Sequence, residues 1–414
     1  MSSPQPVRGT HDLLPEDFRR HAHVRDTARD IAACFGYGEM ATPIFEFTEV
    51  FARTMGETSD VVSKEMYSFE SRGGESMTLR PEYTAGICRS FISNGLQQNV
   101  PFKAFACGPM FRYERPQKGR QRQFHQIDLE CIGAAEAKAD IEVIAVAAAI
   151  LQKLDVLKLC NLQINTLGDA ESRDAYRTAL VDYFNDHKDK LSEDSLARLG
   201  RNPLRILDSK DKGDRVLVAD APVFTDYLNA FSTDFFAEVL EGLEIHGIPY
   251  EVNRRLVRGL DYYTHTAFEF VTDALGAQGA VIAGGRYDGL IEMLGGKPTP
   301  GIGWAGGMER LCLLTDTLPE EARPIAIIPV GEEAESVTTK LAHDLRLQGI
   351  VIEMSFKGNP GKRMKRANRL NAKAAILIGE DELARNACTF RNLDAGTQEE
   401  IPLASLSAKI AELV

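Results

Sequence analysis

The residues most suited to chemistry lie between positions 111 and 130, where two strand-like runs flank a basic turn. Side chains alternate across a strand, so one face of the second run collects a ring, an amide and two carboxylates, from Phe124, Gln126, Asp128 and Glu130. Arg112 and Glu114 are expected to face the same way on the first run. The turn adds four cations, Arg115, Lys118, Arg120 and Arg122. This pattern indicates a charged ligand, although a solvated hairpin with ordinary cross-strand ion pairs fits this segment equally well.

The segment from Thr78 to Ala85 is expected to end a strand and begin a helix. Glu82 near the helix start suits an ammonium group, and Thr84 adds a hydroxyl acceptor. Acids are also favoured as caps at helix starts. Taken alone, the segment therefore fits a helix cap better than a ligand site.

The segment from Leu256 to Thr264 places Arg258, Tyr262 and Tyr263 around a glycine turn. Arginine grips carboxylate or phosphate in a fixed fork geometry, and tyrosine hydroxyls can read a polar ligand. A tight turn closed by a pair between Arg258 and Asp261 is the alternative. A further glycine-lined turn is expected between Ala283 and Leu290.

The segment from Gly301 to Arg310 contains the sequence pattern G-x-G-x-x-G. A dinucleotide site would place this pattern early in a strand–turn–helix unit, with an acid about 20 positions later. Here it comes late and runs into a polar linker, so we reject that interpretation. Small residues would instead leave room for a planar ligand, and a helix starting near Gly307 would carry Arg310 in its first turn, where anions are favoured.

Other site chemistries are not indicated. No phosphate-binding loop and no nucleophile–histidine signature stands out, and His125 lies on the apolar face of its strand as a structural residue. The seven cysteines are scattered without a Cys-x-x-Cys pair, which predicts neither a disulfide framework nor a metal site. This cysteine usage favours a reducing, cytoplasmic location.

The expected elements explain how such residues would be positioned. Amphipathic and apolar helices are predicted at 15–35 and 140–154, a short strand at 44–47 and a hairpin over 102–133. From about 168 to 230 apolar residues recur with helical spacing among many charged ones, which indicates a helical insertion. Ser192 is expected to start one of its helices. Strands are expected again at 250–252 and 266–271.

A polar, proline-bearing linker at 315–324 separates a second domain. The order strand, helix, strand, helix, strand over 325–378 predicts a small, largely parallel α/β domain. Its helix at about 360–371 carries a basic stripe formed by Lys362, Arg366, Arg369 and Lys373. Such a stripe suits a phosphate backbone, and a solvated helix face is the equal alternative.

Composition agrees with a soluble globular protein of two or three domains. The 414 residues are 44% hydrophobic and 26% charged, as in ordinary soluble proteins. The first eight residues lack the apolar stretch of a secretory signal, and the longest apolar run is too short to cross a membrane. A net charge of −12 argues against coating nucleic acid through bulk charge, but allows a local basic footprint.

Taken together, the segments resemble histidyl-tRNA synthetases, which are class II aminoacyl-tRNA synthetases. The resemblance is carried by residues 8–12, 78–85, 111–126, 202–208, 258–263, 301–310 and 379–383. It implies an α+β fold: an antiparallel-sheet catalytic domain over 1–320 with the helical insertion, and an α/β anticodon-binding domain over 324–414. Pro43 would belong to the motif that forms a homodimer. Tyr83 stands where many members have glycine.

The resemblance also implies a role for each site residue. Arg112 would hold the α-phosphate of ATP, Arg120 and Arg310 would bind toward the γ-phosphate, and Phe124 would stack on adenine with Glu114 nearby. The α-amino group of histidine would meet Glu82, Thr84 and Gln126, and its carboxylate Arg258. Glu130, Tyr262 and Tyr263 would read the imidazole, whose N–H groups a buried carboxylate can accept.

The implied reaction joins histidine to tRNA(His) with ATP and Mg²⁺. The histidine carboxylate would attack the α-phosphate, expel pyrophosphate and then pass to the terminal ribose, with Arg112 and Arg258 as the catalytic residues and no covalent enzyme intermediate. Two rivals remain: a non-catalytic synthetase-like regulatory subunit of histidine biosynthesis, and an RNA-binding module. The retained 258–263 segment and the domain at 325–414 disfavour the first, and the three arginines at 112, 258 and 310 disfavour the second.

Overall fold

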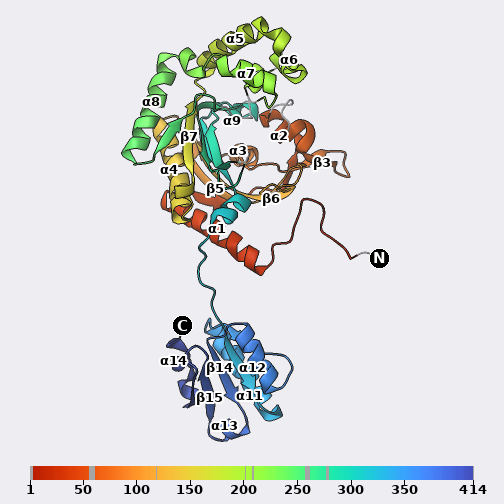
Figure 1. The fold of residues 1–414 in the computed structure, drawn as a ribbon, viewed down its shortest axis with the longest axis vertical. Coiled ribbons are helices and arrows are strands. Elements are labelled where there is room, and N and C mark those ends of the chain that lie inside the picture. Colours follow the sequence, from red (N-terminus) through yellow and green to blue (C-terminus); the bar gives the residue numbers. More distant parts are fainter. Residues whose placement is uncertain are drawn as a thin grey trace. The chain divides into compact units, whose positions relative to one another are not determined.

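The computed structural model of the protein describes residues 3–55, 61–117, 119–200, 202–207, 209–256, 262–276 and 279–413. The chain forms two compact units, Met1–Leu318 and Pro319–Val414, which are described separately (Figure 1). Lys118 and the residues 258–261, including Arg258, lie outside the described residues. In the part of the chain that is described, no helix has the length and apolar character needed to span a membrane.

A sheet of eight strands forms the centre of the first unit (Figure 1). In spatial order the strands are β1 (Gly38–Met40), β5 (Phe102–Phe111), β6 (Gln123–Ile132), β11 (Gly301–Gly307), β10 (Ala280–Arg286), β9 (Thr264–Val271), β7 (Asn161–Thr166) and β8 (Tyr250–Val252). The strands from β5 to β7 pair antiparallel, and only the two edge pairs are parallel. An antiparallel sheet with helices packed on it confirms the predicted α+β class.

Helices α1 (Pro15–Cys34) and α4 (Ala137–Lys153) pack together and against the sheet, as predicted. Proline and two acids in the first turn of α1 suit a helix N-terminus. Val24 and Ala28 are buried in the shared core, whereas Phe18, on the predicted apolar face, is 53% exposed. Four further helices are α2 (Thr48–Met55), α3 (Thr84–Ser93), α9 (Leu290–Met293) and α10 (Met308–Leu314).

A second sheet has three antiparallel strands, in the order β2 (Phe45–Phe47), β4 (Ser76–Leu79) and β3 (Tyr67–Glu70). The strand predicted at 44–47 is therefore present. The end of β4 leads through Glu82 into α3, so the predicted strand-to-helix step at 78–85 is confirmed. This step places Glu82 and Thr84 beside the large sheet.

The insertion is helical and has its own core. Its helices are α5 (Ala170–Asp186), α6 (Glu193–Leu199) and α7 (Lys212–Asp220), followed by α8 (Ala230–Ile245), which packs on α4. Tyr176, Leu180 and Phe184 are buried within it. The Ser192 side chain accepts a hydrogen bond from the Ser195 amide, as expected of the residue that starts α6.

Two local predictions in the first unit are wrong. Strand β5 ends at Phe111, so Arg112 and Glu114 lie in the connection to β6 and not on a strand face. The glycine turn expected between Ala283 and Leu290 begins as strand: residues 283–286 belong to β10, in which Gly284 lies opposite Trp304 of β11. A Cβ atom on Gly284 would lie 2.1 Å from the Gly303 carbonyl oxygen, so glycine there permits close strand packing.

The second unit has a five-stranded sheet in the order β13 (Ile352–Glu353), β12 (Ile325–Pro329), β14 (Ala374–Ile378), β15 (Ala387–Asn392) and β16 (Thr397–Pro402). Its helices are α11 (Glu332–Leu347), α12 (Pro360–Arg369), α13 (Glu380–Ala384) and α14 (Leu406–Ala411). The first three strands are parallel as predicted, but β15 and β16 pair antiparallel, so the sheet is mixed. Strand β15 follows β14 through the short helix α13 alone, because antiparallel neighbours need no long crossover connection.

Candidate active site

A cavity of about 300 Å³ opens on the large sheet of the first unit. It is lined by ten of the residues predicted from the sequence: Glu82, Thr84, Arg112, Glu114, Arg120, Phe124, Gln126, Tyr262, Tyr263 and Arg310. They come from the segment before α3, the connection between β5 and β6, strand β6 itself, the segment before β9, and α10. The fold thus brings together residues that are up to 228 positions apart in the chain (310 minus 82).

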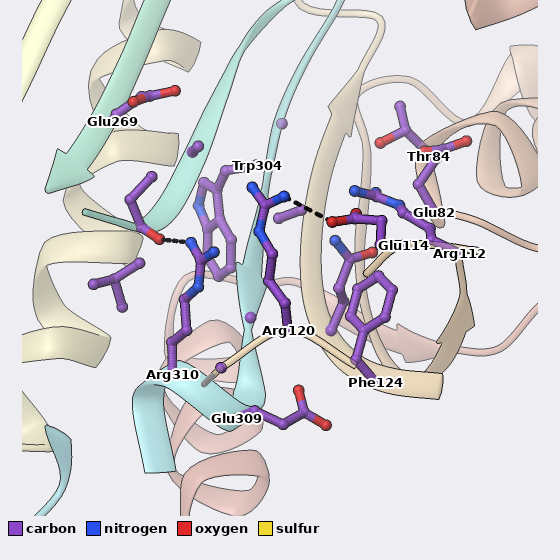
Figure 2. Close-up of a pocket in the computed structure, with 18 of the residues that line it drawn as sticks. Glu82, Thr84, Arg112, Glu114, Arg120, Phe124, Glu269, Trp304, Glu309 and Arg310 are labelled. Carbon is purple, nitrogen blue, oxygen red and sulfur yellow. Dashed lines mark hydrogen bonds and ion pairs between the residues drawn. The ribbon is translucent and has the colours of Figure 1, made fainter. Parts of the chain in front are cut away.

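One end of the cavity is cationic. Arg120 and Arg310 lie side by side, and Arg112 lies beyond Glu114 (Figure 2). Arg120 Nη1 is 2.7 Å from Glu114 Oε2, and Arg310 Nη1 donates to the Ala280 carbonyl. Burial lowers the pKa of Arg310, and the charges of Arg120 and Arg112 lower it further. The charges of Glu114 and Glu269 act in the opposite direction. An anionic ligand would stabilise the charged forms of the three guanidinium groups that meet at this end.

An aromatic surface adjoins the cations. The Arg112 guanidinium lies 5.2 Å from the centre of the Phe124 ring, and Arg112 Nε donates to the Pro81 carbonyl over 2.9 Å. The backbone bond fixes the arginine although it lies outside a strand. A half-buried ring beside a fixed cation suits a planar group that carries negative charge.

The other end of the cavity is acidic and more deeply buried. Glu82 Oε1 accepts a hydrogen bond of 3.0 Å from the Ala85 amide, so the residue does cap α3 while it lines the cavity. The Thr84 hydroxyl donates to Glu130 Oε1 over 2.6 Å, and the Tyr287 hydroxyl donates to Glu130 Oε2. Glu130 is fully buried and lies behind Thr84 and Tyr287 rather than among the lining residues.

Glycines in β11 make room for this acidic end. Gly303 lies opposite Glu130 in the strand register, and a Cβ atom there would lie 1.7 Å from Glu130 Oε2. A Cβ atom on Gly301 would lie 2.2 Å from the Tyr287 ring. The glycine pattern thus serves close packing between strands, and the rejection of a dinucleotide site is confirmed because the segment is an antiparallel strand.

Burial controls the protonation of the acidic end. It raises the pKa of Glu130 to about 8, although the hydrogen bonds from Thr84 and Tyr287 act in the opposite direction. It also raises the pKa of Glu82, against the hydrogen bond from the Ala85 amide and the charge of Arg112. A cationic or hydrogen-bond-donating ligand would stabilise the ionised forms of both acids.

Four aromatic or acidic lining residues had no site role in the sequence interpretation: Glu269, Tyr287, Trp304 and Glu309. Tyr287 was placed in an expected turn, and it lies directly after β10, where its amide donates to the Gly301 carbonyl over 2.7 Å. Glu309 also binds His125, whose amide donates to it over 2.9 Å and whose Nδ1 lies 3.0 Å from Glu309 Oε1. His125 packs edge-on against His21 at 5.3 Å, which fits its predicted structural role.

The basic stripe of the second unit is only partly as predicted. Lys362, Arg366 and Arg369 are exposed on α12, but Arg366 pairs with Glu353. Lys373 lies beyond the end of α12, and its ammonium group donates to the Leu413 carbonyl, so it does not belong to the stripe.

Comparisons with known proteins point to one family. The family model described as histidyl-tRNA synthetase matches residues 9–311, and the model described as anticodon binding domain matches residues 324–413. The chain is 59% identical to a histidine–tRNA ligase of Rhodospirillum rubrum over 415 aligned positions, and 57% identical to one of Gluconacetobacter diazotrophicus over 413. In both cases the alignment covers 100% of each chain.

A solved structure agrees. The chain superposes on the apo histidyl-tRNA synthetase of S. aureus with a TM-score of 0.84 and 37% sequence identity, over 97% of this chain and 98% of that one. Sequence and fold therefore match the same kind of protein over their whole length.

Proposed function

The chain belongs to the histidyl-tRNA synthetase family, and from that premise we propose how its cavity activates histidine and serves tRNA. The chain is a histidine–tRNA ligase: it forms histidyl-adenylate and pyrophosphate from histidine and ATP, then transfers histidine to the 3′ end of tRNA(His). Relatives with this name match it from end to end. The alternative of a non-catalytic regulatory subunit is therefore wrong.

ATP is proposed to bind at the cationic end of the cavity. Adenine stacks on Phe124, Arg112 contacts the α-phosphate, and Arg120 and Arg310 contact the outer phosphates. The support is their common cavity, in which Arg310 lies close enough to Arg120 and Arg112 for their charges to lower its pKa. Glu114 holds Arg120 until the phosphates replace it as the partner of that guanidinium.

Histidine is proposed to bind at the acidic end. Glu82, Thr84 and Gln126 take its α-ammonium group, and Arg258 takes its carboxylate. Tyr262, Tyr263 and Glu130 read the imidazole, with Glu130 acting from behind Thr84 and Tyr287. An imidazole N–H that approaches this buried, hydrogen-bonded acid gives selectivity, because an apolar side chain offers no donor to the polar groups there.

This arrangement places the two reactants in order along one cavity. The histidine carboxylate lies between the ammonium site and Arg112, next to the α-phosphate that it attacks. Arg112 and Arg258 neutralise the charge that builds up at phosphorus, and Arg120 and Arg310 stabilise the departing pyrophosphate. Catalysis then consists of positioning and charge neutralisation, with no side chain forming a covalent bond.

Mg²⁺ is proposed to arrive with ATP, bound to its phosphates as part of the substrate. Glu114, Glu269 and Glu309 line the cavity near Arg120 and Arg310 and offer carboxylate oxygens to such a cation. Oxygen ligands of this kind suit Mg²⁺, which keeps several waters when it binds with phosphates.

We also propose a homodimer that uses the three-stranded sheet. Four large apolar side chains on or beside β2 and β3 are 43–51% exposed: Ile44, Phe45, Phe47 and Phe69. Phe45 and Phe69 contact each other edge-on at 6.4 Å, so they form one patch. Apolar patches on folded proteins mark interfaces, and this one adjoins Pro43. The second unit is proposed to bind the anticodon region of tRNA(His), in a cytoplasmic protein.

One observation carries the proposal: Arg112, Arg120, Arg310 and Phe124 line the same cavity as Glu82, Thr84 and Gln126. Histidine-dependent exchange of pyrophosphate into ATP tests the first step, and charging of tRNA(His) tests the second. We expect both activities. Exchange that does not depend on histidine, or no exchange at all, would contradict the assignment.

A further inference from the structure

We propose that Asp128 provides a second carboxylate, beside Glu82, for the α-ammonium group of bound histidine. This inference rests on the proposed histidine site. It assigns a role to a residue of β6 that neither lines the cavity nor has a role in the reaction described above.

Strand register places Asp128 beneath the acidic end. It shares the face of β6 that carries Gln126 and Glu130, and it lies between them. Its cross-strand neighbours are Ala106 of β5 and Ala305 of β11. Ala305 lines the cavity, and its small side chain is the one that lies beside Asp128 across the strand pair.

The Asp128 carboxyl group lacks a partner. Its side chain is completely buried, and within the described ranges neither carboxylate oxygen has a hydrogen-bond partner. The same holds for Gln126 Oε1, on the same face of β6. Buried polar atoms are nearly always hydrogen-bonded, and an unpaired buried carboxylate is costly. Two adjacent sets of unpaired acceptors therefore indicate a ligand that donates.

The groups around Asp128 do not supply this donor. Arg80 is the main nearby cation, but its Nε donates to the Pro109 carbonyl over 2.9 Å and its Nη1 to the Thr42 carbonyl over 2.8 Å. Its guanidinium also stacks at 4.1 Å on the Tyr83 ring. The other ionisable groups that act on Asp128 are Glu82, Glu130, Arg112, Tyr83 and Cys107.

The ligand chemistry follows from this set. Three buried carboxyl groups, with the Gln126 amide oxygen, repel an anion and require a cation or a strong donor. Among the residues that the structure describes, no group of three or more histidine, cysteine or acidic side chains is arranged to hold a metal ion. The α-ammonium group, proposed to sit at Glu82 and Gln126, is the cation that fits.

Protonation supplies a consequence that can be measured. Burial raises the pKa of Asp128 well above its ordinary value, and the negative charges of Glu130 and Glu82 raise it further, against Arg80 and Arg112. Without a ligand, burial and the neighbouring acids thus favour the neutral form of Asp128. A bound ammonium group favours the ionised form, so its entry should release a proton to the solvent.

The first experiment compares histidine with imidazole-4-propionate, which lacks the ammonium group, in calorimetric titrations of the full chain. We expect D128N to weaken histidine binding roughly tenfold or more, as for a lost bond to a charged group. Binding of the analogue should change by less than about twofold, because the analogue has no ammonium group for Asp128 to contact. Equal weakening of both ligands would overturn the proposal, since it indicates a purely structural role.

The second experiment compares the protons released when histidine binds to the wild-type chain and to D128N. Titrations at pH 7 in buffers of different ionisation enthalpy count these protons. The wild-type chain should release more protons than D128N, because the ligand is the same and only the wild-type chain carries the Asp128 carboxyl group. Equal proton release would overturn the proposal. Wild-type exchange activity, measured alongside, separates this outcome from a failure of the assigned function.

Discussion

The Thr84 hydroxyl donates a hydrogen bond of 2.6 Å to the Glu130 carboxylate, although 46 positions separate the two residues in the chain. The bond joins the first residue of α3 to the middle of β6, and Tyr287 donates to the other carboxylate oxygen. The acid behind the cavity thus orients two groups that line it. Five predictions follow from this site and its surroundings.

Replacing Glu130 by glutamine keeps the shape of the side chain but removes the carboxyl group that can ionise when histidine binds. We expect the KM for histidine to rise about 10- to 100-fold, the range for a lost hydrogen bond to a charged group, because the imidazole loses its acceptor system. The KM for ATP should stay nearly constant, since Glu130 lies at the opposite end of the cavity. Histidine-dependent exchange kinetics would measure both constants. An unchanged KM for histidine would contradict the role given to Glu130.

The same variant should alter how stability depends on pH. The pKa of Glu130 is about 8 in the folded protein, above its ordinary value of 4.5. Between these values the folded chain keeps a proton that the unfolded chain has lost, so stability falls as pH rises. E130Q does not pay this cost. Its melting temperature relative to wild type should therefore increase between pH 5 and pH 8.5. A constant difference across this range would contradict the raised pKa.

Replacing Arg310 by alanine should reduce the exchange rate by about 100-fold or more, as for other groups that stabilise charge in a transition state. Lysine at this position should restore only part of the activity, because it keeps the charge but not the fork geometry. Saturating exchange assays with ATP would show the effect. Near-normal rates in the alanine variant would remove Arg310 from the proposed phosphate site.

Replacing Asp214 by alanine should destabilise the insertion. The hydroxyls of Ser192, Ser195 and Ser209 each lie 2.6 Å from Asp214 Oδ2. Burial raises the pKa of Asp214, but these bonds outweigh it and lower the pKa to about 2. The stabilisation is therefore complete above pH 4 and is lost as pH falls toward 2.

We expect a loss of about 2 kcal/mol for D214A at pH 7 by chemical denaturation, in the range for hydrogen bonds to a charged group. The matched control is D211A. Asp211 caps α7 through the Gly213 and Asp214 amides, so its loss should cost about 1 kcal/mol. If D214A were no less stable than D211A, the network around Asp214 would not hold the insertion.

Replacing Arg258 by alanine should abolish adenylate formation and leave the fold intact, because the residue is proposed to bind the histidine carboxylate and the adjacent phosphate. Exchange assays would measure the first effect and circular dichroism the second. Near-normal exchange in a folded variant would refute this assignment.

Several features of the fold were predictable because their signals are local. Helical periodicity located α1, the apolar run located α4, and Ser192 marked the start of α6. The alternation of side chains along a strand was enough to place Phe124, Gln126, Asp128 and Glu130 on one face of β6. Strand β16 was missed because it is an edge strand with mostly exposed residues, so it lacks the apolar run of a buried strand.

The sequence by itself determined the kinds of groups in the cavity, since side-chain type and strand alternation are properties of neighbouring residues. Only the tertiary structure decided which groups meet. Gly303 lies opposite Glu130 because β11 pairs with β6 across a long chain separation. That register leaves space for Glu130, joins it to Thr84 and Tyr287, and buries Asp128 with no hydrogen-bond partner among the residues that the structure describes. Burial and partners depend on contacts between distant segments, and no local pattern encodes them.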